Sequence, residues 1–287
     1  MLVVANPAAG LRRGRDAGEA AARAAGPLAE AVALVRTEGP GHARRLAASA
    51  ASEGFEVVVA TGGDGTAHEV ANGLAGTEAA LAVAPAGTMN LLARVLELPL
   101  DPALAVERAL TRGRLRRILP GVAGETLFLL MAGIGLDAWV LHRLLERVHG
   151  KVDFRRYVLG TLLEMRRYPY APIRLDCDGE TLLGTSAIVG RSPLYGGFLR
   201  PTPRASLDRD VLEVCALDLP GALHYLRLIP SLWSGAHAGH AGVASRLLAE
   251  VRASSDAPDV PVQVDGEPFG ALPMTFGISE RSLRILA

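Results

Sequence analysis

The segment with the clearest chemical meaning is a glycine-rich turn, Thr61-Gly62-Gly63-Asp64-Gly65-Thr66. It follows the apolar, β-branched run Val57–Ala60 and leads into Thr66–Leu74, which has the composition of a helix. Glycines permit positive φ angles and let the backbone approach a ligand closely, and a helix N-terminus attracts anions such as nucleotide phosphates. Asp64 would repel phosphate alone, but it could hold a Mg²⁺ ion that bridges phosphate oxygens. The alternative is a tight strand-to-helix turn in which Asp64 caps the helix.

Three further polar turns follow short apolar runs in the first third of the chain. Pro85-Ala86-Gly87-Thr88-Met89-Asn90 follows Leu81–Ala84, Asn6-Pro7-Ala8-Ala9-Gly10 follows Leu2–Ala5, and Thr37 follows Leu34–Arg36. In an open parallel sheet, ligands bind at the carboxyl ends of the strands. Polar turns after four such strands therefore predict a single nucleotide site.

The elements that must position these residues fall into two patterns. The first third alternates strands with helices, which predicts an α/β domain with a parallel sheet and flanking helices. After about Arg112, strand candidates follow one another with turn signals such as Asp178-Gly179, which predicts a mostly antiparallel, sandwich-like β domain. We expect domains at residues 1–116 and 117–287. The strands expected in the second are Leu115–Leu119, Thr126–Ala132, Ile173–Cys177, Leu182–Val189, Leu212–Leu217, Val262–Val264, Met274–Ile278 and Leu283–Leu286. Its expected helices are Trp139–Val148, Tyr157–Arg167, Ala222–Ser234 and Val243–Leu248.

Several motifs occur in an order and spacing that resemble a known family. They are Asn6-Pro7-x-x-Gly10, Thr37-x-x-Pro40-Gly41-His42-Ala43, Gly62-Gly63-Asp64-Gly65-Thr66 with Glu69-x-x-Asn72-Gly73, Pro85-x-Gly87-Thr88-x-Asn90, Ala132-Gly133-Ile134-Gly135-x-Asp137-Ala138 and Val264-Asp265-Gly266-Glu267. Together they resemble the diacylglycerol kinase catalytic-domain superfamily, which includes bacterial lipid kinases and sphingosine kinases. The resemblance covers nearly the whole chain.

The resemblance implies an ATP-dependent lipid kinase. It implies that the glycine-rich turn binds ATP phosphates, with Asp64 also counted as a catalytic residue, and that Glu267 is the general base for a lipid hydroxyl, with Mg²⁺ as cofactor. The acceptor would be a diacylglycerol-like or sphingoid lipid, and the active site would lie in the cleft between the domains. The residues assigned to the nucleotide are Asn6, Thr37, Gly62, Gly63, Asp64, Gly65, Thr66, Gly87, Thr88 and Asn90.

The chain departs from the family pattern in two places. Leu91 follows Asn90 where many members carry an aspartate that is thought to organise the catalytic metal. Asp208 and Asp210 lie in a turn where some bacterial members hold a structural Mg²⁺, but Arg209 stands between them. These two acids are therefore either structural metal ligands or solvated turn residues. Leu91 keeps a second hypothesis open, a catalytically silent protein that binds nucleotide or lipid. A third is a non-lipid kinase, such as an NAD or sugar-phosphate kinase.

Composition limits the partners and the location. The 287 residues carry 30 basic and 30 acidic side chains, so no charge excess indicates a nucleic-acid partner. Two cysteines, Cys177 and Cys215, fit buried thiols in a reducing compartment. No apolar run has the length of a transmembrane helix. We therefore expect a cytoplasmic protein that visits the membrane surface and could form a homodimer. Arginines from Arg112 to Arg117 and basic residues from Arg143 to Arg156 would meet anionic lipids or form ordinary solvated faces.

Overall fold

The computed structural model describes residues 1–10, 14–147 and 154–287, and it divides into two compact units. Unit 1 contains Met1–Pro120 together with Ser279–Ala287, and unit 2 contains Gly121–Ile278. The division differs from residues 1–116 and 117–287 in two ways. The boundary falls after Pro120, so the strand expected at Leu115–Leu119 in the second domain lies in unit 1, and the last strand also returns to unit 1. Val148 and Lys151, at the predicted helix end and in the predicted basic cluster, lie outside the described residues.

Unit 1 is built on a six-stranded sheet in the order β2-β1-β3-β4-β18-β5. The first four strands and β18 are parallel, and β5 is antiparallel to β18. Val3, Val59 and Ala82 are buried in the sheet core, as expected for apolar runs between helical layers. The bounds are β1 (Leu2–Ala5), β2 (Ala33–Arg36), β3 (Val57–Gly62), β4 (Ala80–Pro85), β5 (Leu115–Ile118) and β18 (Leu283–Leu286).

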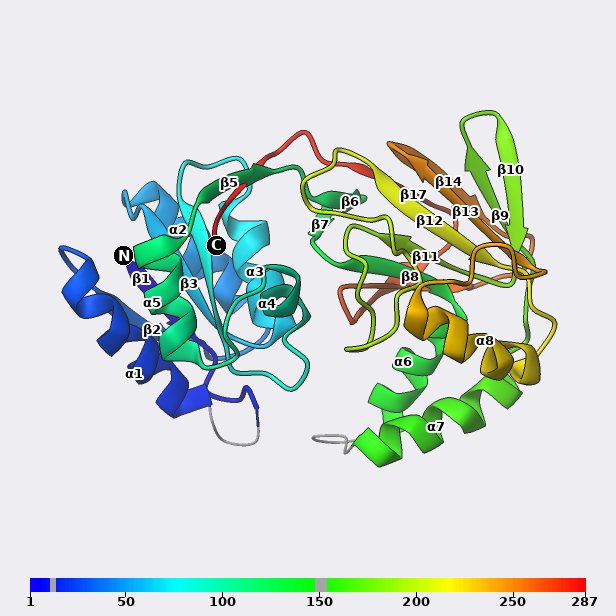
Figure 1. Cartoon of the computed structure of the whole chain (residues 1–287), viewed down its shortest axis with the longest axis horizontal. Coiled ribbons are helices and arrows are strands. Elements are labelled where there is room, and N and C mark those ends of the chain that lie inside the picture. Colours follow the sequence, from blue (N-terminus) through cyan, green and yellow to red (C-terminus); the bar gives the residue numbers. More distant parts are fainter. Residues whose placement is uncertain (11–13, 148–153) are drawn as a thin grey trace. The chain divides into compact units, whose positions relative to one another are not determined.

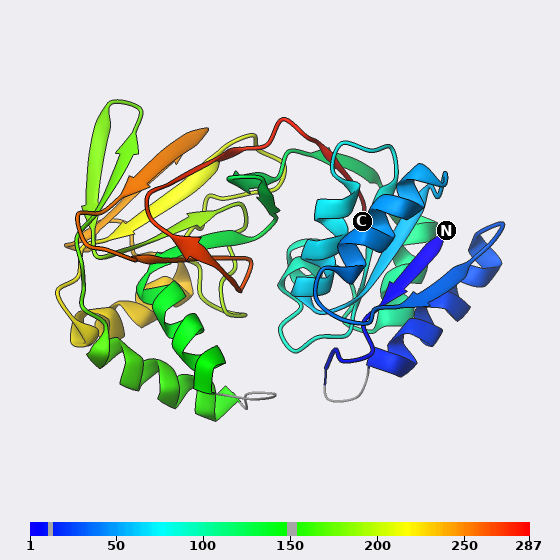
Figure 2. The same ribbon diagram turned by 180° about the vertical axis from the view of Figure 1, so that it is seen from behind.

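Helices cover both faces of this sheet. α1 (Gly14–Ala25) and α5 (Pro102–Arg112) pack on the face in front in Figure 1. α2 (His42–Ser52) and α3 (Asp64–Leu74) pack on the other face, which is in front in Figure 2. The short α4 (Leu91–Val95) follows β4, and a 3₁₀ turn (Gly26–Leu28) follows α1. The parallel α/β architecture predicted for the first third of the chain is confirmed.

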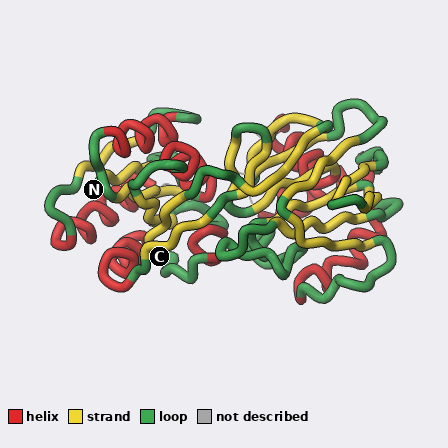
Figure 3. The backbone as a smooth tube through the Cα atoms, turned by 90° about the horizontal axis from the view of Figure 1, so that it is seen from above, coloured by secondary structure: helices red, strands yellow, loops and turns green. Residues whose placement is uncertain are grey.

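Unit 2 is a sandwich of two antiparallel six-stranded sheets, and its high strand content is visible in Figure 3. One sheet has the order β10-β9-β14-β17-β6-β7, and the other has the order β13-β12-β11-β8-β15-β16. Residues of both sheets share one core. The bounds are β6 (Gly121–Ala123), β7 (Thr126–Phe128), β8 (Met131–Gly135), β9 (Ile173–Cys177), β10 (Glu180–Gly184), β11 (Ser186–Gly190), β12 (Leu212–Leu217), β13 (Val243–Leu248), β14 (Glu250–Ser254), β15 (Pro261–Val264), β16 (Glu267–Ala271) and β17 (Met274–Ile278).

Three helices, α6 (Leu136–Arg147), α7 (Phe154–Arg167) and α8 (Ala222–Ser234), gather on one side of the sheets (Figures 1 and 2). Strand β12 shows why the helices pack on this side. Its residues Leu212, Val214 and Ala216 face the sandwich core, whereas Cys215 and Leu217 alternate with them and pack against the helices. Both faces of this strand are therefore buried, and the antiparallel β-rich second domain is confirmed.

Three local predictions for unit 2 are wrong. Val243–Leu248 forms strand β13 rather than a helix, because all six residues pair with the edge of β12, and tertiary pairing overrides local propensity. Leu182–Val189 is divided between β10 and β11, which belong to different sheets. Thr126–Ala132 is divided between β7 and β8, again in different sheets.

Candidate active site

The polar turns of unit 1 gather at one edge of its sheet, as predicted. The strands β2, β1, β3 and β4 are neighbours and parallel, so their carboxyl ends share that edge. Backbone hydrogen bonds join adjacent turns: Thr37 donates to Ala5 (2.8 Å), Asn6 donates to Thr61 (2.9 Å), and Ala86 donates to Gly62 (2.7 Å).

The glycines of these turns are required by close packing. The positive φ angles expected at Gly62, Gly63 and Gly65 are not found. A Cβ atom added at Gly87 would lie 2.5 Å from the Cα of Gly63, so the two turns touch backbone to backbone. A Cβ atom at Gly62 would overlap Thr66. The result is a surface of main chain at the N-terminus of α3, where helix N–H groups have no partner within the helix and an anion binds favourably.

Asp64 is the first residue of α3, and the N-cap of that helix is Gly63, so Asp64 does not cap its own helix. Its Oδ1 instead accepts a hydrogen bond from the backbone N–H of Leu92 (3.0 Å), near the start of α4. This bond links the two glycine turns through a half-buried carboxylate. A carboxylate has lone pairs for several contacts, so the Leu92 bond is compatible with a metal contact.

The two asparagines predicted to bind nucleotide also shape the turns. Asn90, with a φ of 49°, accepts from the Gly87 N–H (2.8 Å) and donates to the Gly87 carbonyl (3.0 Å), which closes the second turn. Asn6 donates to the hydroxyl of Thr66 (3.1 Å). Thr88 is exposed at the tip of the second turn, so its hydroxyl remains available to a ligand.

Two further residues of this edge have structural roles that sequence reasoning did not assign. The carboxylate of Glu69 accepts hydrogen bonds from the N–H groups of Gly41 (2.8 Å) and Ala43 (3.0 Å), which caps α2 from a different helix. In the sequence, only its place in the Glu69-x-x-Asn72-Gly73 motif pointed to a role for Glu69. Leu91 is buried (7% exposed) at the start of α4, where it belongs to the apolar core.

In unit 2, Asp265 anchors the turn that carries Glu267. The buried Asp265 carboxylate accepts hydrogen bonds from the N–H groups of Leu129 (2.8 Å), Leu130 (2.9 Å) and Met131 (2.9 Å). Asp265 and Gly266 both have positive φ angles, 48° and 87°, as in a tight hairpin turn between β15 and β16. The hairpin turn, which Asp265 holds in place, presents Glu267 as an exposed residue.

A second buried carboxyl group is connected to the same turn. Asp137, in the first turn of α6, accepts hydrogen bonds from the Tyr195 hydroxyl and from Nε2 of Gln263 (2.7 Å). Oε1 of Gln263 in turn accepts the N–H of Gly266 (2.7 Å). Burial raises the pKa of Asp137, and the Tyr195 and Gln263 hydrogen bonds oppose that shift. A side chain at Gly133 would overlap both Asp137 and Gln263, which explains this glycine in its motif.

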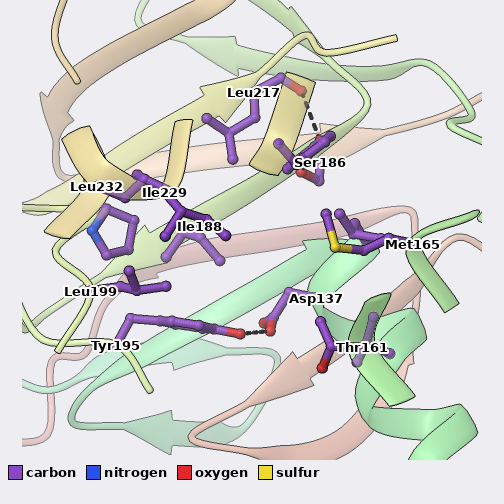
Figure 4. A pocket seen from close by; sticks show the side chains of 14 residues that line it. Asp137, Thr161, Met165, Ser186, Ile188, Tyr195, Leu199, Leu217, Ile229 and Leu232 are labelled. Carbon is purple, nitrogen blue, oxygen red and sulfur yellow. Dashed lines mark hydrogen bonds between the residues drawn. The ribbon is translucent and has the colours of Figure 1, made fainter. Parts of the chain in front are cut away.

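Asp137 lies at one side of a cavity of about 170 Å³ that is otherwise mainly apolar. In Figure 4, the oxygen atoms of Tyr195 and Asp137 face each other at this side, while Ile188, Leu232 and Ile229 lie away from them. The cavity lies among the three helices and strands β11 and β12. Sequence reasoning did not assign Asp137, Tyr195 or Gln263 to a site, although Asp137 was part of a recognised motif.

The structural metal site expected at Asp208 and Asp210 stays a prediction that no third side-chain ligand among the described residues supports. Both residues are exposed, and the described part of the chain contains no group of three or more acidic, histidine or cysteine side chains that could hold a metal ion. The turn is held instead by the buried guanidinium group of Arg191. It donates to four backbone carbonyls, those of Ser206 (3.0 Å), Leu207 (3.1 Å), Arg209 and Val211 (2.8 Å). Burial lowers the pKa of Arg191 to about 10, so it remains a cation at neutral pH.

Comparisons with known proteins agree with this architecture. Residues 1–121 match the diacylglycerol kinase catalytic domain, and residues 131–287 match the YegS C-terminal NAD kinase beta sandwich-like domain. The chain is 31% identical over 254 residues to a diacylglycerol kinase of Mycobacterium tuberculosis, covering 85% of this chain and 81% of that protein. It is 32% identical over 290 residues to a YegS-like lipid kinase of Pseudomonas aeruginosa, covering 96% and 91%. A crystal structure of a diacylglycerol kinase from Bacillus anthracis has the same fold, with a TM-score of 0.75, 18% identity, and 99% and 95% coverage.

An α/β unit with glycine turns at its carboxyl edge, joined to an antiparallel sandwich, therefore defines a kinase architecture. The chain belongs to the diacylglycerol kinase catalytic-domain family, a family of lipid kinases. The resemblance found in the sequence motifs is confirmed. Among the helices of the described residues, none combines the length and the apolar character needed to cross a bilayer.

Proposed function

We propose that the protein transfers the γ-phosphate of ATP to a hydroxyl group of a diacylglycerol-like or sphingoid lipid, with Glu267 as general base. The observation that carries this proposal is the hydrogen-bonded path from the apolar cavity to the Glu267 turn. Tyr195 and Asp137 line the cavity. Gln263 donates a hydrogen bond to Asp137, and the N–H of Gly266 donates one to Gln263. A mainly apolar cavity is thus linked through a hydrogen-bonded network to an exposed carboxylate.

Unit 1 supplies the nucleotide site in this proposal. Gly63 and Gly87 pack backbone to backbone, so no side chain separates the two turns, and phosphate oxygens would approach the N–H groups at the start of α3. Mg²⁺ is usually held in such sites by one or two carboxylates together with phosphates and water. Asp64 fits the role of that carboxylate, and the bound ion would neutralise charge on the phosphates.

Unit 2 supplies the acceptor site. The apolar lining of the cavity suits an acyl chain, and its polar side suits the hydroxyl-bearing end of the lipid, because Asp137 and Tyr195 can exchange hydrogen bonds with it. The reaction would take place at the cytoplasmic face of a membrane, where ATP from the cytoplasm and a lipid in the bilayer can both reach the protein.

The proposed reaction balances with Glu267 as the proton acceptor. The Glu267 carboxylate removes the hydroxyl proton as the lipid oxygen forms a bond to the γ-phosphorus. The bond between that phosphorus and the bridging oxygen of the β-phosphate breaks, and ADP leaves. A carboxylate on a hairpin anchored by Asp265 loses little freedom when the acceptor binds, which favours this role.

The experiment that tests the proposal is transfer of label from γ-labelled ATP to lipids, with Mg²⁺ and a panel of diacylglycerols, sphingoid bases, NAD and sugar phosphates. We expect a labelled lipid product whose formation falls at least about a hundredfold in Glu267→Gln, while the exposed Glu280→Gln variant keeps wild-type activity. Label on NAD or a sugar phosphate would overturn the lipid acceptor. Equal activity in Glu267→Gln would overturn the role of this base.

A second candidate function is a catalytically silent nucleotide-binding protein, and the observation that favours it is Leu91. Its buried aliphatic side chain stands where a metal-binding acid is expected in the family. ATP binding measured by calorimetry, with no label transferred to any acceptor, would support this candidate over the first.

A further inference from the structure

Helix α8 (Ala222–Ser234) is apolar over more of its surface than its packing uses. Its buried residues are Tyr225, Leu228 and Leu232, which join the core beneath the helices. A second apolar stripe faces outward, formed by Leu223, Leu226, Ile229, Pro230 and Trp233. At about 100° per residue, these five positions occupy an arc of about 120°, next to the buried arc. We call these five residues the α8 stripe.

The α8 stripe is strongly exposed. Leu223 is 57% exposed and Trp233 is 63% exposed. The ring of Phe198, itself 41% exposed, lies 5.5 Å from that of Trp233 and extends the apolar surface beyond the helix. Single exposed apolar residues are ordinary, but a contiguous apolar surface of this kind marks an interaction site.

The charged residues of α8 and of the segment 191–207, which carries Phe198, are basic. Arg227 and His224 occupy the remaining arc of α8, and Arg200 is exposed two residues after Phe198. Neither α8 nor the segment 191–207 contains an aspartate or a glutamate. An apolar stripe bordered by basic side chains is complementary to a membrane surface that carries anionic lipids.

The stripe also adjoins the cavity of unit 2. Ile229 belongs to the stripe and lines the cavity, and it is 37% exposed. Leu232 and Leu199, the chain neighbours of Trp233 and Phe198, line it as well, and Figure 4 shows Ile229, Leu232 and Leu199 around it. A membrane in contact with the stripe would therefore be close to the cavity wall.

We propose that the α8 stripe, together with Phe198, is a membrane-docking surface that binds anionic bilayers. The apolar residues enter the interface, Trp233 sits at the level of the headgroups, and Arg227 and Arg200 bind anionic headgroups. The use of this surface to receive the lipid acceptor rests on the proposed kinase function, but docking itself does not. A second copy of the chain is a poorer occupant, because a two-fold contact places the same patch against itself and brings Arg227 and Arg200 of both copies together without an acid.

Co-sedimentation with vesicles of phosphatidylcholine, with and without phosphatidylglycerol, tests the proposal. We expect the full chain to bind the anionic vesicles, and the double variant Leu223→Glu/Trp233→Glu to lose about tenfold or more in apparent affinity. Leu104→Glu is the matched control, because Leu104 is 55% exposed on another helix, α5, and its replacement should leave binding unchanged. Equal binding by the wild type and the double variant would refute the proposal. A wild-type dimer in sedimentation that the double variant abolishes would assign the stripe to a second copy instead.

Tryptophan fluorescence gives a second readout that does not depend on a disruptive change. The chain has two tryptophans, so Trp139→Phe leaves Trp233 as the single reporter. We expect its emission to shift to the blue and to be quenched by brominated lipids when anionic vesicles are added; an unchanged spectrum would count against docking. Phosphorylation of a monomeric short-chain acceptor separates the two proposals. If the double variant loses vesicle binding but keeps this activity, both stand; if wild type shows vesicle binding but no transfer, only the kinase proposal fails.

Discussion

Replacement of Gln263 by leucine tests whether the path between the cavity and the Glu267 turn is a working part of the protein. Gln263 is 2% exposed and uses both ends of its amide, donating to Asp137 (2.7 Å) and accepting from Gly266 (2.7 Å). Leucine has a similar size but can form neither bond. A hydrogen bond to an ionised group contributes about 1.5–3 kcal/mol and one between neutral groups about 1 kcal/mol. We therefore expect Gln263→Leu to lower the free energy of unfolding by about 2–4 kcal/mol.

The assay is urea denaturation of the wild type, Gln263→Leu, Asp137→Asn and the double variant, all at the same pH. In the Asp137→Asn background the Gln263→Leu cost should fall by about 1 kcal/mol, because the donor then meets a neutral amide. Thr181→Val, which removes an exposed hydrogen bond to Asp176, is the control and should change stability by less than about 0.5 kcal/mol. In label transfer, kcat of Gln263→Leu should fall about tenfold, since the Glu267 turn loses one support. Additive stability changes together with a wild-type kcat would refute the coupling of Gln263 to Asp137 and to the turn.

Three further predictions concern other parts of the molecule. Gly87→Ala should weaken ATP binding about tenfold or more, because its Cβ would press on Gly63, whereas Gly39→Ala, where the added Cβ meets no atom within 4 Å, should bind normally; titration with a fluorescent ATP analogue measures both. Arg191→Met should lower the free energy of unfolding by about 3–5 kcal/mol, because four carbonyls lose their donor, and EDTA should leave the wild-type Tm unchanged; a Tm lowered by EDTA would restore a metal to this turn. Burial lowers the pKa of His237 in the folded protein. Between the unfolded pKa of about 6.5 and this lower folded pKa, the unfolded chain binds a proton that the folded chain does not. The free energy of unfolding should therefore fall as the pH falls through this range. His237→Gln should flatten this fall in denaturation curves taken between pH 5 and pH 8; an unchanged slope would argue against the buried neutral histidine.

Much of unit 1 could be predicted from the sequence because its signals are local. The apolar runs Val57–Ala60 and Leu81–Ala84 are short, β-branched or alanine-rich, and followed directly by glycine turns, a pattern typical of buried parallel strands. Once the strands are parallel, chain geometry alone places the turns at one edge of the sheet. The nucleotide edge follows from this local order, and so does the membership of Gly62, Gly63 and Gly87 in one surface.

The roles of individual polar residues were decided by contacts between distant parts of the chain. Asp64 caps the helix after the next strand, and Asp265 binds N–H groups more than a hundred residues before it. Gln263 and Asp137 are 126 residues apart, yet they share one hydrogen bond. Such pairs leave no periodicity or spacing that a reading of the sequence could use.

The sequence by itself determined the order of strands and turns in unit 1, the family, and the positions of the glycines, because each of these depends on neighbours within a few residues. Only the tertiary structure decided that the last strand, Leu283–Leu286, completes the first sheet, that Val243–Leu248 is a strand, and that Arg191 occupies the turn considered for a metal. It also decided that the apolar residues Leu223, Leu226, Ile229 and Trp233 of α8 remain exposed. The physical reason is common to these cases: burial and pairing depend on which surfaces meet, and residues that are far apart in the chain supply those surfaces.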